Sequence, residues 1–236
     1  MKILLLNGPP RCGKDTFAKV IKGFSPSLVH IEKFALPMKL CVPIAYGITQ
    51  ERWAELDSAE LKDKPADELF GRTPREPQIG FSEDFLKKMH GKDIFGRLLL
   101  RRLEHVSAKF ETVAISDSGF REEAEMLVKH YGAENVYLWR IYREGCDYKD
   151  DGRGYIDLED LGVLQFDIEN TVLDDEGDSL KKLKGFVARL YMAFNTPQEN
   201  IKEDKTRDPE LEGIGAYRER IEELMQKEID RGIGTS

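Results

Sequence analysis

Cysteine and histidine are scarce in this sequence, and neither residue type forms a recognisable site. The three cysteines, Cys12, Cys41 and Cys146, are odd in number and share no metal or redox spacing. The four histidines have no carboxylate or cysteine partner at metal-ligand spacing. This usage argues against a zinc or redox centre, and it suits the reducing cytoplasm, where we expect the protein.

Long apolar runs and an excess of basic residues are also missing. No run approaches the roughly 18 apolar residues of a membrane span, and KILLL at the N-terminus is followed by glycine and proline rather than by the rest of a signal peptide. The net charge of −8 argues against a protein that coats nucleic acid, because neutralising phosphates needs a basic face. We therefore expect neither a membrane nor stable nucleic-acid binding.

Apolar runs instead alternate with amphipathic helical patterns along most of the 236 residues. Strands are predicted at 2–7, 28–31, 111–116, 135–142 and 163–168, and helices at about 17–24, 36–48, 94–109, 120–131 and 179–194. This alternation predicts an α/β fold with a five-stranded parallel sheet flanked by helices and right-handed crossovers. Ligands in such sheets bind at the carboxyl ends of the strands.

Two segments interrupt the alternation. Residues 50–92 are polar and proline-spotted with short helical signals, and residues 143–160 are rich in glycine and charge, which predicts a mobile loop. From residue 195 the chain is highly charged up to a helix predicted at about 216–231, which could pack on its own domain or on a partner subunit. We expect one domain over 1–194 with two inserted segments, and a C-terminal extension over 195–236.

The first predicted strand is followed by Gly8-Pro-Pro-Arg-Cys-Gly13-Lys14, the G-x-x-x-x-G-K pattern of a phosphate-binding loop. A strand before it and a helix after it are the context that this motif requires. Backbone N–H groups at the helix start and the helix dipole favour an anion, and the lysine supplies a cation for the outer phosphates. A plain glycine turn would not explain that lysine. The residues predicted to surround the phosphates are Gly8, Arg11, Cys12, Gly13, Lys14, Asp15 and Thr16.

The serine or threonine that usually follows this lysine is absent, and Asp15 stands in its place. A carboxylate about 4 Å from a phosphate charge costs on the order of 4 kcal/mol at an effective dielectric constant near 20. A divalent cation between the two removes that cost, and Mg²⁺ accepts one or two carboxylates together with phosphate oxygens. We therefore predict a Mg²⁺ site at Asp15, with the hydroxyl of Thr16 available to the metal or to a phosphate. The alternative is a decayed loop that no longer binds nucleotide.

Asp117 comes just beyond the strand ETVAIS, at the position of a carboxylate that orients the water of a bound Mg²⁺. An aspartate at a strand end can equally serve only to cap the next helix. Arg121 follows at the start of a helix and so over the predicted cleft; its alternative is a surface arginine paired with Glu122 or Glu125.

Basic side chains in and beside the two inserted segments are candidates for binding a second anion. Arginine donates two parallel bonds to phosphate and lysine acts as a point charge. Each candidate alone is better explained as a solvated surface residue than as a ligand, and only the cluster favours a site: Lys39, Arg72, Arg75, Lys92 and Arg97. The later segment carries Arg140, Arg143 and Arg153, which could close over bound nucleotide. An ordinary exposed hairpin is the alternative.

Taken together, these motifs resemble the bacteriophage-type deoxynucleoside monophosphate kinases, within the wider P-loop nucleoside monophosphate kinase fold. The G-x-x-x-x-G-K-D-T loop is characteristic of that family. FALPMK at 34–39, TPRE at 73–76, ISDSGFREEAE at 115–125 and FDIENTVLDDEGDSLKKL at 166–183 resemble its later blocks in order. The resemblance covers roughly residues 1–193. It departs from the family where a Ser-Gly pair separates Asp117 from Phe120, since an arginine is expected nearer the aspartate.

The resemblance implies a P-loop NTPase fold in which the 50–92 segment binds the acceptor and the 143–160 segment is a lid. It also implies transfer of the γ-phosphoryl group of ATP-Mg to a (deoxy)nucleoside 5′-monophosphate for DNA precursor synthesis, in the host cytoplasm if the protein is phage-encoded. The predicted catalytic residues are Lys14, Arg121, Arg143 and Arg153, the predicted metal ligands are Asp15, Thr16 and Asp117, and the predicted acceptor-binding residues are Lys39, Arg72, Arg75 and Lys92.

Other interpretations stay open at the level of sequence. A P-loop kinase for another acceptor, such as phosphomevalonate or dephospho-coenzyme A, also fits the fold. A kinase for a non-nucleotide phosphate or alcohol would lack a base-stacking pocket, for which the candidates here are Phe34, Tyr46, Trp53, Phe70 and Phe81. A protein of another class would bind ATP without transferring its phosphoryl group. A kinase of nucleic-acid ends is disfavoured by the acidic balance. The accepted base, the sugar and the oligomeric state, including a homodimer, are not determined by these patterns.

Overall fold

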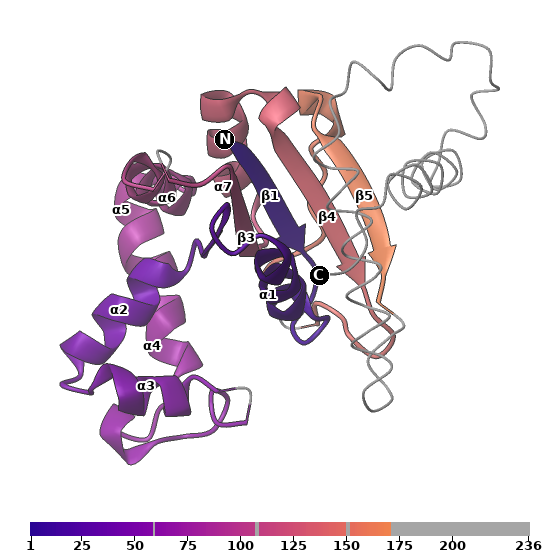
Figure 1. Cartoon of the computed structure of the whole chain (residues 1–236). Helices are drawn as coiled ribbons and strands as arrows, with labels where there is room; N and C mark the ends of the chain where they lie inside the picture. Colours follow the sequence, from indigo (N-terminus) through magenta and orange to yellow (C-terminus); the bar gives the residue numbers. More distant parts are fainter. Residues whose placement is uncertain (59, 107–108, 150–151, 171–236) are drawn as a thin grey trace, which may run out of the picture. The chain divides into compact units, whose positions relative to one another are not determined.

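Five parallel strands form the centre of the computed structural model, which describes residues 1–58, 60–106, 109–149 and 152–170. The strands are β1 (Lys2–Asn7), β2 (Val29–Glu32), β3 (Thr112–Ser118), β4 (Val136–Tyr142) and β5 (Leu164–Glu169). Their order in the sheet is β2-β3-β1-β4-β5 (Figure 1). All five predicted strands are confirmed, with ends shifted by no more than two residues. The predicted helices at 179–194 and 216–231 lie outside the described residues.

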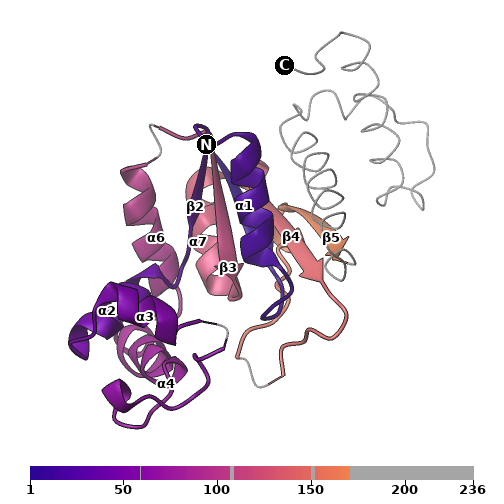
Figure 2. The same cartoon turned by 60° about the horizontal axis from the view of Figure 1, so that its bottom comes forward.

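The central strand β1 is apolar because helices cover both faces of the sheet. Ile3, Leu4, Leu5 and Leu6 are all 0 % exposed. Helix α1 (Lys14–Phe24) lies on one face, whereas α6 (Ile94–Glu104) and α7 (Arg121–Tyr131) belong to the other (Figures 1 and 2). The phosphate loop therefore leaves the sheet at the carboxyl end of its middle strand.

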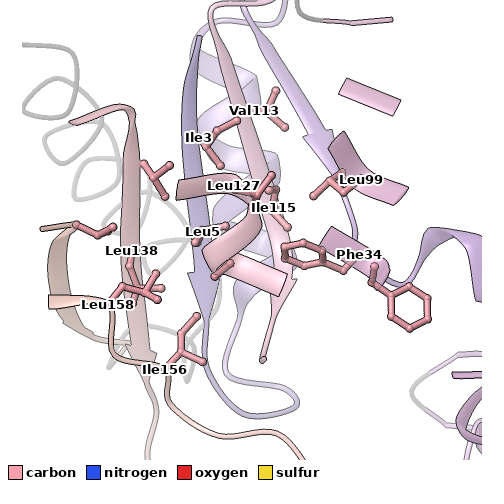
Figure 3. Packing of buried hydrophobic residues seen from close by; sticks show 14 of the residues in the cluster. Ile3, Leu5, Phe34, Leu99, Val113, Ile115, Leu127, Leu138, Ile156 and Leu158 are labelled. Carbon is pink, nitrogen blue, oxygen red and sulfur yellow. The ribbon is translucent and has the colours of Figure 1, made fainter. Parts of the chain in front are cut away.

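The segment 156–158 belongs to the hydrophobic core, which differs from the mobile loop predicted for 143–160. Ile156 is 6 % exposed and Leu158 is 0 % exposed, and both pack in the cluster that includes Leu138 of β4 (Figure 3). The short helix η4 (Glu159–Leu161) follows. Glycine and charge dominate the composition of this stretch and mask the alternation of apolar and polar residues in YIDL. The side chains of Ile156 and Leu158 anchor the second half of the segment in the core.

The segment between β2 and α6 is helical and has a small core of its own. It contains α2 (Leu36–Ala45), α3 (Gln50–Leu56), η1 (Asp67–Leu69), α4 (Arg75–Ile79), the π-helix η2 (Gly80–Lys87) and α5 (Lys88–His90). These helices lie on the side of the sheet where β2 is found (Figure 2). Val42, Trp53, Leu56 and Leu69 form the core, and Tyr46 and Phe81 pack against it.

Several predictions for this segment need correction or stay open. The helix predicted at 36–48 ends at Ala45, and the helix predicted at 94–109 ends at Glu104. Of the aromatic residues proposed for a base pocket, Trp53 is buried in the small core, whereas Phe70 is 88 % exposed.

Among the helices that the structure describes, none combines the length and the apolar character needed to cross a bilayer.

Candidate active site: the phosphate loop

Residues 8–13 connect β1 to α1, and the backbone itself requires both glycines of the motif. Gly13 has φ 106°, in the left-handed region that favours glycine, and it is the N-cap of α1. A Cβ atom on Gly8 would lie 2.6 Å from the Sγ of Cys12 and 2.6 Å from the carbonyl oxygen of Ile141. The loop therefore packs directly against the end of β4.

We expect Gly8→Ala to weaken ATP binding at least about tenfold, which corresponds to about 1.4 kcal/mol. The added methyl group meets a backbone carbonyl that cannot move freely, so the loop must shift, and overpacking of this kind typically costs about 1–3 kcal/mol. Calorimetric titration with ATP measures the change. Gly23→Ala is the matched control, because a Cβ on Gly23, in the last turn of α1, meets nothing within 4 Å. Equal ATP affinities of the two variants would contradict the prediction.

Lys14 lies along the loop. Its Nζ donates hydrogen bonds to the carbonyl oxygens of Gly8 at 2.6 Å and Pro9 at 2.7 Å. Burial lowers the pKa of Lys14, and the positive charge of nearby Arg153 lowers it further. Burial also raises the pKa of the Cys12 thiol, so this side chain stays neutral and fills space beneath the loop.

Asp15 follows Lys14 in the first turn of α1 and contacts β3 and the residue that directly follows β2. Its Oδ1 accepts a hydrogen bond from the Oγ of Ser116 at 2.8 Å and lies 2.6 Å from the Nζ of Lys33. Burial by itself raises the pKa of Asp15, but Lys33 and Ser116 outweigh that effect and the net pKa is lowered. The carboxylate is therefore ionised at neutral pH.

The chemistry of Asp15 fits a hard cation. The ionised side chain is 62 % exposed, and Thr16 beside it is half-buried. Mg²⁺ is commonly held by one or two carboxylates together with phosphate oxygens and waters. Within the described parts of the chain, no group of three or more His, Cys, Asp or Glu side chains is placed to hold a metal ion.

Asp117 lies in β3 and holds the backbone that leads into α2. Its Oδ1 accepts a hydrogen bond from the N–H of Phe34 at 2.8 Å, and its Oδ2 accepts one from the N–H of Ala35 at 2.9 Å. Burial raises the pKa of Asp117, and these two bonds oppose the rise. These bonds are made to the backbone before α2, whereas the alternative predicted from the sequence is a cap of the next helix, α7. A role in metal binding stays a prediction.

Of the two arginines predicted to act from the 143–160 segment, Arg143 contacts the loop, and Arg153 lies close enough to Lys14 for its charge to lower the pKa of that lysine. The Nη1 of Arg143 donates a hydrogen bond to the carbonyl oxygen of Arg11 at 3.2 Å. The aliphatic stem of Arg153 packs on Gly119, where a Cβ would lie 2.6 Å from the Cδ of the arginine. Together with Lys14 they bring three cationic side chains near the phosphate loop.

Arg121 has a different environment. Its guanidinium lies 2.6 Å from both Glu125 and Asp160, and these two carboxylates raise its pKa. It donates a further bond to the carbonyl oxygen of Asp157 at 2.5 Å. Arg121 is therefore paired with Glu125, as the alternative interpretation of the sequence predicted. Its catalytic role stays a prediction that these contacts do not support.

Arg75 lies beside Lys62, a lysine that the sequence patterns do not reveal. The Nε of Arg75 lies 2.6 Å from Asp63, and its backbone N–H donates to the carbonyl oxygen of Lys62 at 3.2 Å. Burial lowers the pKa of Lys62, and the charges of Arg75 and Arg11 lower it further. Lys62, Arg75 and Arg11 therefore lie near one another. Lys62 belongs to a polar stretch without a motif, so no local signal singles it out.

The other predicted acceptor-binding residues are paired with carboxylates. Lys39 lies 2.5 Å from Asp57, which also accepts a bond from Gln78 at 2.9 Å. The side chain of Arg72 is 65 % exposed and pairs with Glu76, and that of Lys92 is 79 % exposed and pairs with Glu122. Their acceptor-binding roles stay predictions.

A buried charge cluster beside α7 also escapes sequence reasoning. The side chain of Lys87 is only 8 % exposed; its Nζ lies 2.8 Å from Glu83 and 3.5 Å from the ring centroid of Phe120, a cation–π contact. Glu123 is 3 % exposed, and burial raises its pKa to about 8. The positive charge of Lys87 limits that rise, and the charge of Asp117 adds to it.

Asn170, which directly follows β5, contacts the loop as well. The Nδ2 of Asn170 donates a hydrogen bond to the carbonyl oxygen of Cys12 at 2.7 Å, and the backbone N–H of Asn170 donates to the carbonyl of Tyr142 at 2.7 Å. Asn170 is 4 % exposed. The loop is thereby held from the strand on the far side of β4.

The topology and the loop together define the fold. A strand–GxxxxGK–helix unit at the carboxyl end of the central strand of a β2-β3-β1-β4-β5 parallel sheet is the α/β fold of a P-loop NTPase. The fold class predicted from the sequence is therefore confirmed.

Two solved structures are remotely similar to this chain. No family model matches the chain, and no curated protein matches it. Among solved structures it is similar to a shikimate kinase from Acinetobacter baumannii in complex with shikimate, at 12 % identity over 99 % of this chain and 96 % of that one, with a TM-score of 0.31. A gluconokinase from Sinorhizobium meliloti 1021 gives 12 % identity over 83 % and 98 %, with a TM-score of 0.35. Likenesses this remote carry no argument about the reaction.

Proposed function

We propose that this chain is a kinase that transfers the γ-phosphoryl group of ATP to a nucleoside 5′-monophosphate. One observation supports the transfer step, namely that three cationic side chains lie near the phosphate loop. Lys14 bonds to two carbonyl oxygens of the loop, Arg143 bonds to a third, and the charge of Arg153 acts on Lys14. Cations placed around a helix N-terminus suit the β- and γ-phosphates of a nucleotide and the charge on a phosphoryl group in flight.

The acceptor in this proposal is an anion, so the reaction needs no strong general base. Positioning and charge neutralisation then supply most of the catalysis. Asp15 and Thr16 are the residues that would hold Mg²⁺, which when bound neutralises charge on the phosphate oxygens. Lys62 and Arg75 lie near Arg11 of the loop and are suited to an acceptor that itself carries phosphate. The nucleoside, and the preference for deoxyribose, rest on the resemblance of the sequence motifs.

The test is to incubate the protein with ATP-Mg and each common ribo- and deoxynucleoside monophosphate, and to follow the formation of ADP and of the diphosphate. We expect turnover with several deoxynucleoside monophosphates. Phosphomevalonate and dephospho-coenzyme A belong in the same panel, because consumption of either in place of the nucleotides would assign a different acceptor. ATP binding without consumption of any acceptor would favour a non-catalytic nucleotide-binding protein.

A further inference from the structure

A buried asparagine joins the phosphate loop to the segment that carries Arg153. Asn7 is the last residue of β1, immediately before Gly8, and it is 0 % exposed. Its Nδ2 donates to the carbonyl oxygens of Ser118 at 2.8 Å and Gly154 at 3.0 Å. Asn7 thus bridges the end of β3 and the 152–158 segment.

The same amide makes further contacts, of which the bond to Oδ1 uses its acceptor. The Oδ1 of Asn7 accepts a hydrogen bond from the N–H of Ile156 at 3.1 Å, and Nδ2 lies 3.1 Å from the hydroxyl oxygen of Tyr148. A neutral amide is suited to this place because it offers donors and an acceptor on one short side chain. Aspartate at neutral pH would lack the donors, and leucine of similar size would lack both.

These bonds hold the backbone next to both residues of the contact between Arg153 and Gly119. Ser118 precedes Gly119, on which the stem of Arg153 packs, and Gly154 follows Arg153 directly. Asn7 therefore binds the backbone next to each of the two residues in that contact. Asn7 also directly precedes Gly8, the first residue of the phosphate loop. One residue therefore positions both the start of the loop and the backbone next to Arg153.

We propose that Asn7 is a positioning residue, which holds Arg153 beside Lys14 so that its guanidinium meets the phosphates of bound nucleotide. This inference rests on the proposed function and extends it to a residue outside the phosphate-loop motif. Small errors in placing a charged group near a transferring phosphoryl group can cost about a hundredfold in rate. Loss of the Asn7 bonds should therefore act on kcat through Arg153.

The kinetic test is a double-mutant cycle with Asn7→Leu and Arg153→Met, assayed with ATP-Mg and an accepted monophosphate. We expect Asn7→Leu to lower kcat about 10- to 100-fold with the KM for ATP changed by less than about threefold, because Lys14 and the loop still bind ATP. The double variant should be no slower than Arg153→Met alone. Additive effects, or an unchanged kcat in Asn7→Leu, would overturn the proposal.

Two further variants keep this test decisive. Asn135→Leu is the matched control: Asn135 precedes β4 and bonds locally to the carbonyl of Tyr131 at 2.9 Å, so kcat should not change. If Asn7→Leu does not fold, Gly119→Ala replaces it, because its Cβ would displace the stem of Arg153 while the Asn7 bonds stay. Its effect on kcat should likewise vanish in the Arg153→Met background, and persistence there would overturn the proposal.

A spectroscopic measurement needs no acceptor. In the wild-type protein, addition of a non-hydrolysable ATP analogue should shift the Nε–H resonance of Arg153, and this shift should be lost in Asn7→Leu or in Gly119→Ala. A wild type that shows the shift but no turnover would defeat the proposed kinase and leave the positioning role supported. A shift that is absent from the wild type, or unaltered in the variants, would defeat the positioning role.

Discussion

Replacing Lys14 with alanine is expected to lower kcat for phosphoryl transfer by about a thousandfold. The ammonium group bonds to the carbonyl oxygens of Gly8 and Pro9 and so lies on the surface that the proposed function assigns to the outer phosphates. Loss of one preorganised charge or donor at such a site typically costs a factor of about 100–1,000 or more, and a thousandfold corresponds to about 4 kcal/mol. Steady-state ADP release with an accepted monophosphate measures the loss.

Lys19→Ala is the control for Lys14→Ala. Lys19 is exposed on the same helix, so its removal changes the net charge equally without touching the loop. We expect Lys19→Ala to keep wild-type kcat, and we expect both variants to melt within a few degrees of the wild type. A Lys14→Ala protein that keeps more than about a tenth of wild-type kcat would show that turnover does not depend on this loop.

Replacing Glu123 with glutamine is expected to stabilise the protein at pH 8 by about 4–5 kcal/mol. The folded-state pKa of Glu123 is about 8, whereas an unfolded chain has a pKa near 4.3. Between these values the unfolded chain has released a proton that the folded chain still holds. Stability therefore falls as pH rises, by at most about 1.4 kcal/mol per pH unit from this group. Glutamine keeps the shape of the side chain and cannot ionise.

Urea unfolding at several pH values between 5 and 9 tests this expectation. The difference between Glu123→Gln and wild type should be small at pH 5 and should grow up to about pH 8, where it levels off. Glu122→Gln is the control, because Glu122 lies on the same helix with its side chain 42 % exposed, and we expect it to change stability by less than about 0.5 kcal/mol. Parallel pH profiles for wild type and Glu123→Gln would show that Glu123 ionises normally.

Much of the candidate site could be predicted because its signals are local. The spacing of Gly8, Gly13 and Lys14 identifies the phosphate loop, since the backbone of a single turn forms the anion site. The second half of the 143–160 segment could not be placed in this way. Its two buried residues, Ile156 and Leu158, are too few to register as a strand, and their burial depends on a sheet face formed mostly by other segments.

By itself the sequence determined the elements and the loop, because hydrophobic period and glycine spacing are properties of neighbouring residues. The tertiary structure decided which strand ends meet. Since β3 lies between β2 and β1, Asp117 reaches the backbone before α2. Since β1 lies between β3 and β4, Asn7 can bind both Ser118 and Gly154. Such contacts depend on strand order, which is set by long-range packing of whole crossover units and is not encoded in any short stretch of the chain.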